Sequence, residues 1–140
     1  MKKKVIVLFF CCCLLLLVVC GNRIKLELPD NAIQYTLQWN EELDCYELVY
    51  NGKIYRPYCA GDCTKAESVI GYYEESYENY TYMNYVLSYK GQSPDEWLVD
   101  ACDEAADYVN GCTVGFIWKE VNVTNIPKGI EKETEYEWNN

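Results

Sequence analysis

Cysteine and carboxylate side chains are the groups in this chain whose types and spacing could do chemistry. The 140 residues include nine cysteines and 22 acidic residues, but no histidine. Without an imidazole, the chain has no Ser-His-Asp or Cys-His arrangement, no histidine-ligated zinc and no ordinary histidine base. Any chemistry must therefore come from thiols or carboxylates, and we expect a protein that is not an enzyme.

Five cysteines lie beyond the apolar N-terminal segment that ends at Cys20: Cys45, Cys59, Cys63, Cys102 and Cys112. If that segment exports the chain, disulfides are the default use of these cysteines. Cys102 and Cys112 fall on the apolar faces of a predicted helix and the strand after it, so a bridge between them is reasonable. Cys59–Cys63 would close a small loop and leave Cys45 free, but Cys45–Cys59 and Cys45–Cys63 compete with it. The alternative is a four-thiolate metal site from Cys59, Cys63, Cys102 and Cys112. The C-x3-C and C-x9-C spacings are looser than those of zinc knuckles, so we predict no metal and no cofactor.

Carboxylates cluster in the same predicted helix, where one face carries Asp100, Asp103, Glu104 and Asp107. This acidic face could bind a cation or dock a partner, but a solvated helix face is the simpler interpretation. Calcium loops interleave their ligands with Gly and Asn in non-helical backbone, and that layout is missing here. A pair of carboxylates acting as in a glycosidase remains the basis of one alternative, a small hydrolase.

The helix itself is predicted over residues 94–109. Ser93 suits the N-cap, Pro94 the first helical position, and Glu96 the capping box. Apolar residues then recur at helical spacing, and Gly111 suits the position just after the C-terminus.

The rest of the domain is predicted to be β-structure. Residues 33–39 alternate strictly between apolar and polar, as in a half-buried strand. Asn51-Gly52 predicts a two-residue hairpin turn that places Glu47 opposite Arg56. Further strands are predicted over 67–73, with a bulge at Gly71, over 80–89 and over 112–120.

These elements predict an α+β fold, in which an antiparallel meander of about five to six strands, or a partly closed barrel, packs against one amphipathic helix near 94–109. The predicted organisation is a signal peptide or membrane anchor over 1–19, a tether over 20–32, a single domain over 33–130 and a mobile acidic tail over 131–140.

The net charge and the aromatic content limit the classes of partner that this chain could bind. Cleavage of the predicted signal peptide would remove Lys2, Lys3 and Lys4. The remaining chain would then have nine basic and 22 acidic residues, which is a net charge of −13. Such a surface repels phosphate backbones, so we expect no nucleic-acid partner. The chain also has 14 tyrosines and four tryptophans. Aromatic rings pack well in β-sheets, and exposed ones can stack on sugars or anchor a protein.

The N-terminus gives the location. Three lysines precede an unbroken apolar run from Val5 to Val19, which is too short for a comfortable membrane span but suits a secretory signal. With Leu17-Val18-Val19-Cys20 at its end, this leader resembles that of bacterial lipoproteins, although Val19 stands where that family usually has Gly, Ala or Ser. The resemblance covers the leader only. It implies lipidation of Cys20 and an extracytoplasmic domain anchored to the cell membrane, with an uncleaved leader as the alternative anchor.

Together these features predict a membrane-tethered extracytoplasmic domain that binds another protein or a cationic peptide. A carbohydrate-binding module and a small carboxylate-dependent hydrolase are the alternatives. An exposed linear row of rings would favour the sugar, a compact acidic and aromatic patch the protein, and a cleft with two facing carboxylates the hydrolase.

Overall fold

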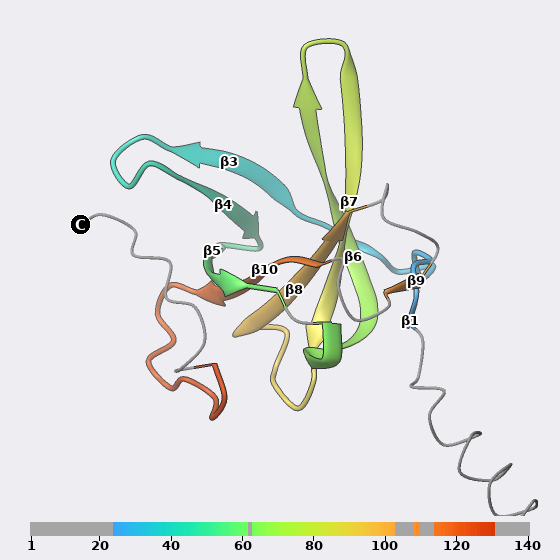
Figure 1. The fold of residues 1–140 in the computed structure, drawn as a ribbon. Helices are drawn as coiled ribbons and strands as arrows, with labels where there is room; N and C mark the ends of the chain where they lie inside the picture. Colours follow the sequence, from blue (N-terminus) through green and yellow to red (C-terminus); the bar gives the residue numbers. More distant parts are fainter. Residues whose placement is uncertain (1–23, 62, 103–107, 110–113, 131–140) are drawn as a thin grey trace, which may run out of the picture.

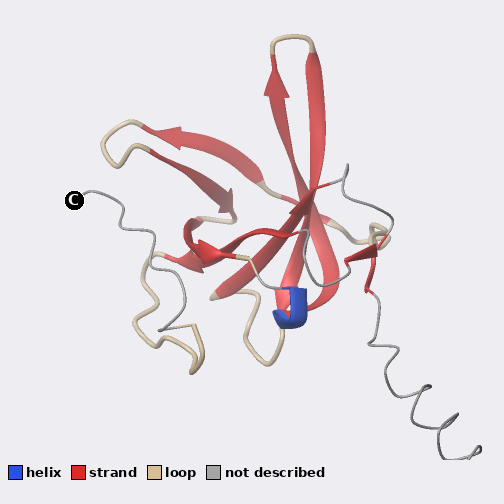
Figure 2. Cartoon of the chain, in the orientation of Figure 1, coloured by secondary structure: helices blue, strands red, loops and turns tan. Residues whose placement is uncertain are grey.

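A single mixed sheet of eight strands dominates the computed structural model, which describes residues 24–61, 63–102, 108–109 and 114–130 (Figures 1 and 2). The strand order is β2-β6-β7-β8-β10-β5-β4-β3, and β1 and β9 form a separate pair. The strands are β1 (Ile24–Lys25), β2 (Ile33–Gln34), β3 (Thr36–Asn40), β4 (Cys45–Tyr50), β5 (Lys53–Ala60), β6 (Ala66–Tyr77), β7 (Tyr80–Tyr89), β8 (Trp97–Cys102), β9 (Tyr108–Val109) and β10 (Val114–Glu120). A short 3-10 turn, η1 (Cys63–Lys65), precedes β6.

One chain segment lies at both edges of the sheet and nearly closes it into a barrel. β2 pairs in parallel with β6, with Ile33 opposite Gly71, whereas β3 pairs antiparallel with β4. Between them, the Tyr35 N–H donates to the Tyr72 carbonyl at 2.8 Å. The segment 33–40 therefore joins the first and last strands of the order. The prediction of a purely antiparallel meander is wrong, while the partly closed barrel agrees with the structure.

The predicted helix over 94–109 is wrong in the residues that the structure describes, which contain no α-helix. Ser93 does cap a turn: its hydroxyl accepts a hydrogen bond from Asp95 N–H, and its carbonyl accepts from Trp97 N–H. The chain then continues as β8 between β7 and β10. Residues 103–107 lie outside the described residues, so the described fold is all-β and not α+β.

The physical reason is that β8 is buried on both faces. Trp97 and Val99 pack on the outer face of the sheet, whereas Leu98 packs inside the barrel. A strand covered on both faces reads as a continuous apolar run, which periodicity cannot separate from a helix. Local capping signals are worth about 1 kcal/mol each, and the burial of one Trp, Leu or Val side chain contributes more.

The predicted hairpin at Asn51-Gly52 is confirmed. Asn51 and Gly52 both have positive φ, at 48° and 77°, and Val49 lies opposite Ile54 as expected. Glu47 and Arg56 form the predicted ion pair, with 2.8 Å between Glu47 Oε1 and Arg56 Nε. The strand predicted over 80–89 has those bounds in β7, and the expected bulge lies at Gly71. β6 is longer than the predicted 67–73.

Two clusters of buried side chains stabilise the sheet, one on each face. The inner cluster fills the barrel and contains Tyr35, Leu48, Tyr55, Tyr73, Val86, Leu98 and Trp118. The outer cluster includes Leu26 from the segment expected to be a tether, and Ile130 from the end of the described chain. The predicted leader over 1–19, Cys20 and the tail over 131–140 lie outside the described residues. Within those residues, no helix is long and apolar enough to span a membrane.

Candidate functional site

Five aromatic side chains gather near the ends of two hairpins, and we call them the aromatic surface: Trp39, Tyr46, Tyr77, Tyr80 and Tyr82. Four of them are 41–70% exposed, which is unusual for rings of this size, and Tyr82 is half-buried. The hairpins β3–β4 and β6–β7 extend from the body of the sheet and diverge toward their tips (Figure 1).

Strand register places these rings on one continuous face. Side chains two residues apart share a face of a strand, so Trp39 continues the inner face of Leu37. In the same way, Tyr77 and Tyr82 continue the inner face of Tyr73 beyond the barrel. Beyond the end of the β2–β6 pairing, the inner faces of β3 and β6 are not covered by another described strand and are exposed to solvent.

One electrostatic effect links the two hairpins. The Tyr77 hydroxyl donates a hydrogen bond to the Glu75 carboxylate, which raises the pKa of Tyr77, and Tyr46 on the other hairpin adds a smaller effect in the same direction. Such an influence is screened over about 10 Å, so Tyr46 and Tyr77 lie within electrostatic range of each other.

Two of the three ring pairs meet at steep angles. Trp39 and Tyr46 are directly opposite across β3 and β4, with ring centroids 4.9 Å apart and planes at 72°. Tyr77 and Tyr82 meet at 69°, and Tyr80 and Tyr82 at 30°. Edge-to-face packing of this kind stabilises the patch itself. The rings therefore form two faceted groups, one on each hairpin, and not a flat row of parallel rings.

Every charged residue in the two hairpins that carry the aromatic surface is acidic. Residues 33–52 and 66–89 contain no lysine or arginine, while their acidic residues are Glu41, Glu42, Asp44, Glu47, Glu67, Glu74, Glu75 and Glu78. Of these, Glu47 is 2% exposed, and the others are exposed or half-buried. Glu67 lies at the other end of β6 from Tyr77, and Glu47 is paired with Arg56, so the carboxylates that give the surroundings of the rings their negative charge are Glu41, Glu42, Asp44, Glu74, Glu75 and Glu78.

Glu47 holds the β3–β4 hairpin in shape from its outer face. Its carboxylate accepts hydrogen bonds of 2.9 Å from the Gln38 and Asn40 side-chain amides, and one of 2.8 Å from Arg56. Burial alone would raise the pKa of Glu47, but these three donors outweigh burial and lower it. The carboxylate thus fixes three strands beneath the rings of Trp39 and Tyr46.

Asp100, predicted to lie on an acidic helix face, is instead a buried strand residue, 4% exposed, inside the barrel. Its carboxyl accepts hydrogen bonds from the Tyr73 hydroxyl at 2.7 Å and from the Phe116 N–H. Burial raises the pKa of Asp100 despite these donors, and despite the nearby Trp118 indole, which lacks hydrogen-bond geometry. The other predicted members, Asp103, Glu104 and Asp107, lie outside the described residues.

The Asp100→Asn variant is expected to be more stable than the parent at neutral pH, by about 1–3 kcal/mol. Because the folded pKa of Asp100 is raised, the contribution of this carboxyl to stability is fully present below the ordinary value of 3.8 and is lost as pH rises through the folded pKa. Urea unfolding followed by tryptophan fluorescence at pH 3 and pH 7 should show a gain that vanishes in acid. A variant that is less stable at pH 7, while the exposed control Asp30→Asn is unchanged, would contradict this.

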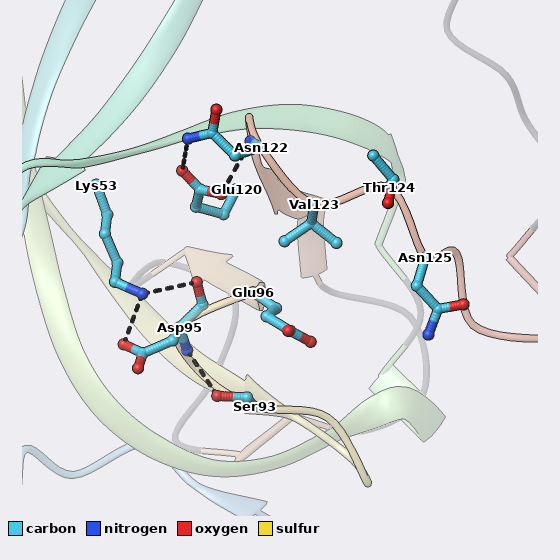
Figure 3. A pocket seen from close by; sticks show the side chains of 9 residues that line it. All are labelled: Lys53, Ser93, Asp95, Glu96, Glu120, Asn122, Val123, Thr124 and Asn125. Atoms are coloured by element: carbon cyan, nitrogen blue, oxygen red, sulfur yellow. Dashed lines mark hydrogen bonds and ion pairs between the residues drawn. The ribbon is translucent and has the colours of Figure 1, made fainter.

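A polar cleft of about 500 Å³ lies at another part of the sheet, and its lining side chains are seen from close by in Figure 3: Lys53, Ser93, Asp95, Glu96, Glu120, Asn122, Val123, Thr124 and Asn125. Both oxygens of Glu120 accept hydrogen bonds from Asn122, at 2.9 and 3.0 Å. Asp95 pairs with Lys53 at 3.3 Å. Two of the three carboxylates are therefore engaged locally, which does not favour a facing pair for hydrolysis.

The cysteines give no site in the described part. Cys45 and Cys59 are buried free thiols, and burial raises the pKa of both, which lowers their reactivity. Among the side chains that the structure describes there is no disulfide, and no group of three or more Cys, Asp or Glu residues that could hold a metal ion. The side chains of Cys63 and Cys102, and all of Cys112, lie outside that part, so the Cys102–Cys112 bridge stays a prediction.

The aromatic surface is the feature that the sequence interpretation missed. Alternation places Trp39 on an apolar face, but it does not show that this face is open to solvent. The one available signal is that both hairpin tips combine rings with glutamates and lack basic residues.

Comparison of the chain with protein-family models gave no match, and searches of curated proteins and of solved structures gave none either. The chemistry of the described surface therefore carries the functional proposal.

Proposed function

We propose that this protein is a membrane-tethered, extracytoplasmic binding domain that recognises a cationic protein or peptide and is not an enzyme. The observation that carries the proposal is the aromatic surface, with its surrounding carboxylates and no basic residue in either hairpin. Trp and Tyr are frequent among the few residues that dominate the binding energy of protein interfaces, whereas charges favour specific partners and speed their encounter.

The shape of the patch favours a peptide or protein over a sugar. Carbohydrate binding by stacking uses the flat faces of rings, but Trp39 and Tyr46 meet at 72° and present an edge and a face. A lysine or arginine side chain can lie over the face of one ring while its charge meets a neighbouring glutamate. The Tyr77–Glu75 pair provides that combination.

The Trp39→Ala variant is expected to bind cationic partners at least about tenfold more weakly than the parent, because central tryptophans contribute roughly 2 kcal/mol or more to an interface. The test is affinity capture from the native envelope with the full chain in detergent, followed by mass spectrometry and titration of the recovered proteins. Binding should also weaken as salt is raised.

Leu28→Ala is the matched control, because Leu28 is 38% exposed but lies away from both hairpins in sequence. Capture that is equal for Trp39→Ala and Leu28→Ala, or captured proteins that are predominantly acidic, would contradict the proposal. Release of the captured proteins by a soluble polysaccharide would favour a carbohydrate-binding module instead.

The tether has a separate test. Metabolic labelling with a clickable fatty acid is expected to mark the parent and to be lost completely in Cys20→Ala, because the thiol of Cys20 follows the apolar run of the leader. Cys45→Ala controls for loss of a cysteine elsewhere. Labelling that survives Cys20→Ala would rule out this lipid site, and a mature protein that keeps residues 5–19 would show an uncleaved anchor.

A further inference from the structure

Two strand edges are open where the barrel fails to close. β2 pairs with β6 at Ile33–Gly71 and Gln34–Tyr72, and beyond this point β3 pairs with β4 alone. β6 continues to Tyr77, but in its last five residues it pairs with β7 alone. Among the described residues no strand covers either edge, and the two hairpins diverge from the junction (Figure 1). We call this opening between β3 and β6 the seam.

The register shows which main-chain groups face the seam on β6. Hydrogen-bonded and non-hydrogen-bonded pairs alternate along an antiparallel ladder, starting from the hydrogen-bonded pair that closes a two-residue turn. Tyr77 and Tyr80 form that closing pair. The N–H and C=O groups of Glu74 and Ser76 therefore point away from β7 and toward the seam.

On β3 the same alternation applies. Tyr50 and Lys53 close the next turn, so Glu47 and Val49 direct their main-chain groups to β3, and Leu37 and Trp39 direct theirs to the seam. The observed hydrogen bond from Tyr35 N–H to the Tyr72 carbonyl agrees with this alternation on both strands.

We propose that the seam takes up an extended, lysine- or arginine-rich segment of a partner protein, which adds to the edge of β6 as a further strand. This inference rests on the proposed function and specifies how its partner is bound. Strand addition obtains affinity from main-chain hydrogen bonds and specificity from alternate side chains. One set of partner side chains faces the aromatic surface, and basic groups meet the carboxylates of Glu74, Glu75 and Glu78.

The negative charge around the seam favours a basic partner segment over a second copy of the chain. A second copy carries the same net charge of −10 and would bring the acidic tips of its own hairpins to the seam. A basic strand neutralises those carboxylates. Natural sheets commonly protect exposed edges with lysine or proline, and β3 and β6 contain neither.

A pair of proline variants tests the proposal. Ser76 and Thr81 lie directly opposite each other, and both N–H groups point out of the hairpin, Ser76 toward the seam and Thr81 away from it. Either proline leaves the β6–β7 ladder intact and removes the same Ser76–Thr81 side-chain hydrogen bond. The two variants therefore differ only in the edge that they block.

The probe is a fluorescent peptide of alternating lysine and valine, titrated into the full chain in detergent micelles and followed by anisotropy. We expect Ser76→Pro to bind about tenfold more weakly than the parent and Thr81→Pro to bind like it. The same peptide with alternate backbone nitrogens methylated should not bind the parent.

Each remaining outcome has a separate meaning. Equal binding by Ser76→Pro and Thr81→Pro, with binding still lost in Trp39→Ala, would overturn strand addition and leave the proposed function standing. Binding of the peptide that is unaffected by Trp39→Ala would overturn the proposed function itself. Oligomers of the parent that Ser76→Pro dissolves would identify a second copy as the occupant and overturn the basic-partner assignment.

Discussion

The Gly71→Ala variant should lose about 3 kcal/mol of folding free energy, at the upper end of the range for overpacking. A Cβ at this position would overlap the carbonyl oxygen of Ile33 and press on the ring of Tyr35. These atoms belong to the segment that closes the barrel, and the carbonyl is backbone, so it cannot move aside alone. Urea unfolding followed by tryptophan fluorescence measures the loss.

Gly91→Ala is the control for this variant. It adds the same methyl group where nothing lies within 4 Å, although Gly91 has a φ of 75°. The left-handed backbone should cost about 1 kcal/mol. If the two variants unfold at the same urea concentration, the close approach of Ile33 to Gly71 does not exist in solution.

The second large effect is expected for Glu47→Gln, which should destabilise the fold by about 2–3 kcal/mol. The amide that replaces one carboxylate oxygen presents hydrogens to donors that previously had an acceptor, either Gln38 or the pair Asn40 and Arg56. Because Glu47 is 2% exposed, water cannot replace the lost contacts. Thermal unfolding at neutral pH checks the size of the effect.

The pH dependence gives an independent check. The folded pKa of Glu47 lies below the ordinary value of 4.5, so its contribution is present above that value and is lost as pH falls through the folded pKa. The difference between parent and Glu47→Gln should therefore shrink in acid. Glu67→Gln, at an exposed position of β6, should change little at any pH. A difference that stays constant down to pH 2 would show that the charge of Glu47 contributes nothing.

These results indicate where sequence interpretation succeeds. The turn at Asn51-Gly52 and the strand over 80–89 are determined by neighbouring residues, and both were predicted with their bounds. Alternation is a local property, and turn chemistry fixes register within a few residues. The Glu47–Arg56 pair follows directly from such a register.

Sequence interpretation fails where pairing with strands distant in the sequence determines the local conformation. Ser93 and Pro94 start a turn as their types predict, but Trp97 is drawn into the sheet by β7 and β10, which lie on both sides of β8. Asp100 then changes from a supposed surface carboxylate to a barrel residue. The exposure of Trp39 likewise depends on where β6 stops pairing with β2, and no residue near Trp39 encodes that.

The position of β10 has a consequence for the order in which the chain can assemble. β10 is the last strand that the structure describes, yet it lies in the middle of the sheet, between β8 and β5. Its partners in β5 are more than fifty residues earlier, as in the pairing of Phe116 with Ala60. Until residues 114–120 have been synthesised, the strands on either side have no common neighbour, and non-local pairings of this kind form slowly. If the chain is exported through its leader, as we propose, this sheet could not be completed until β10 has crossed the membrane.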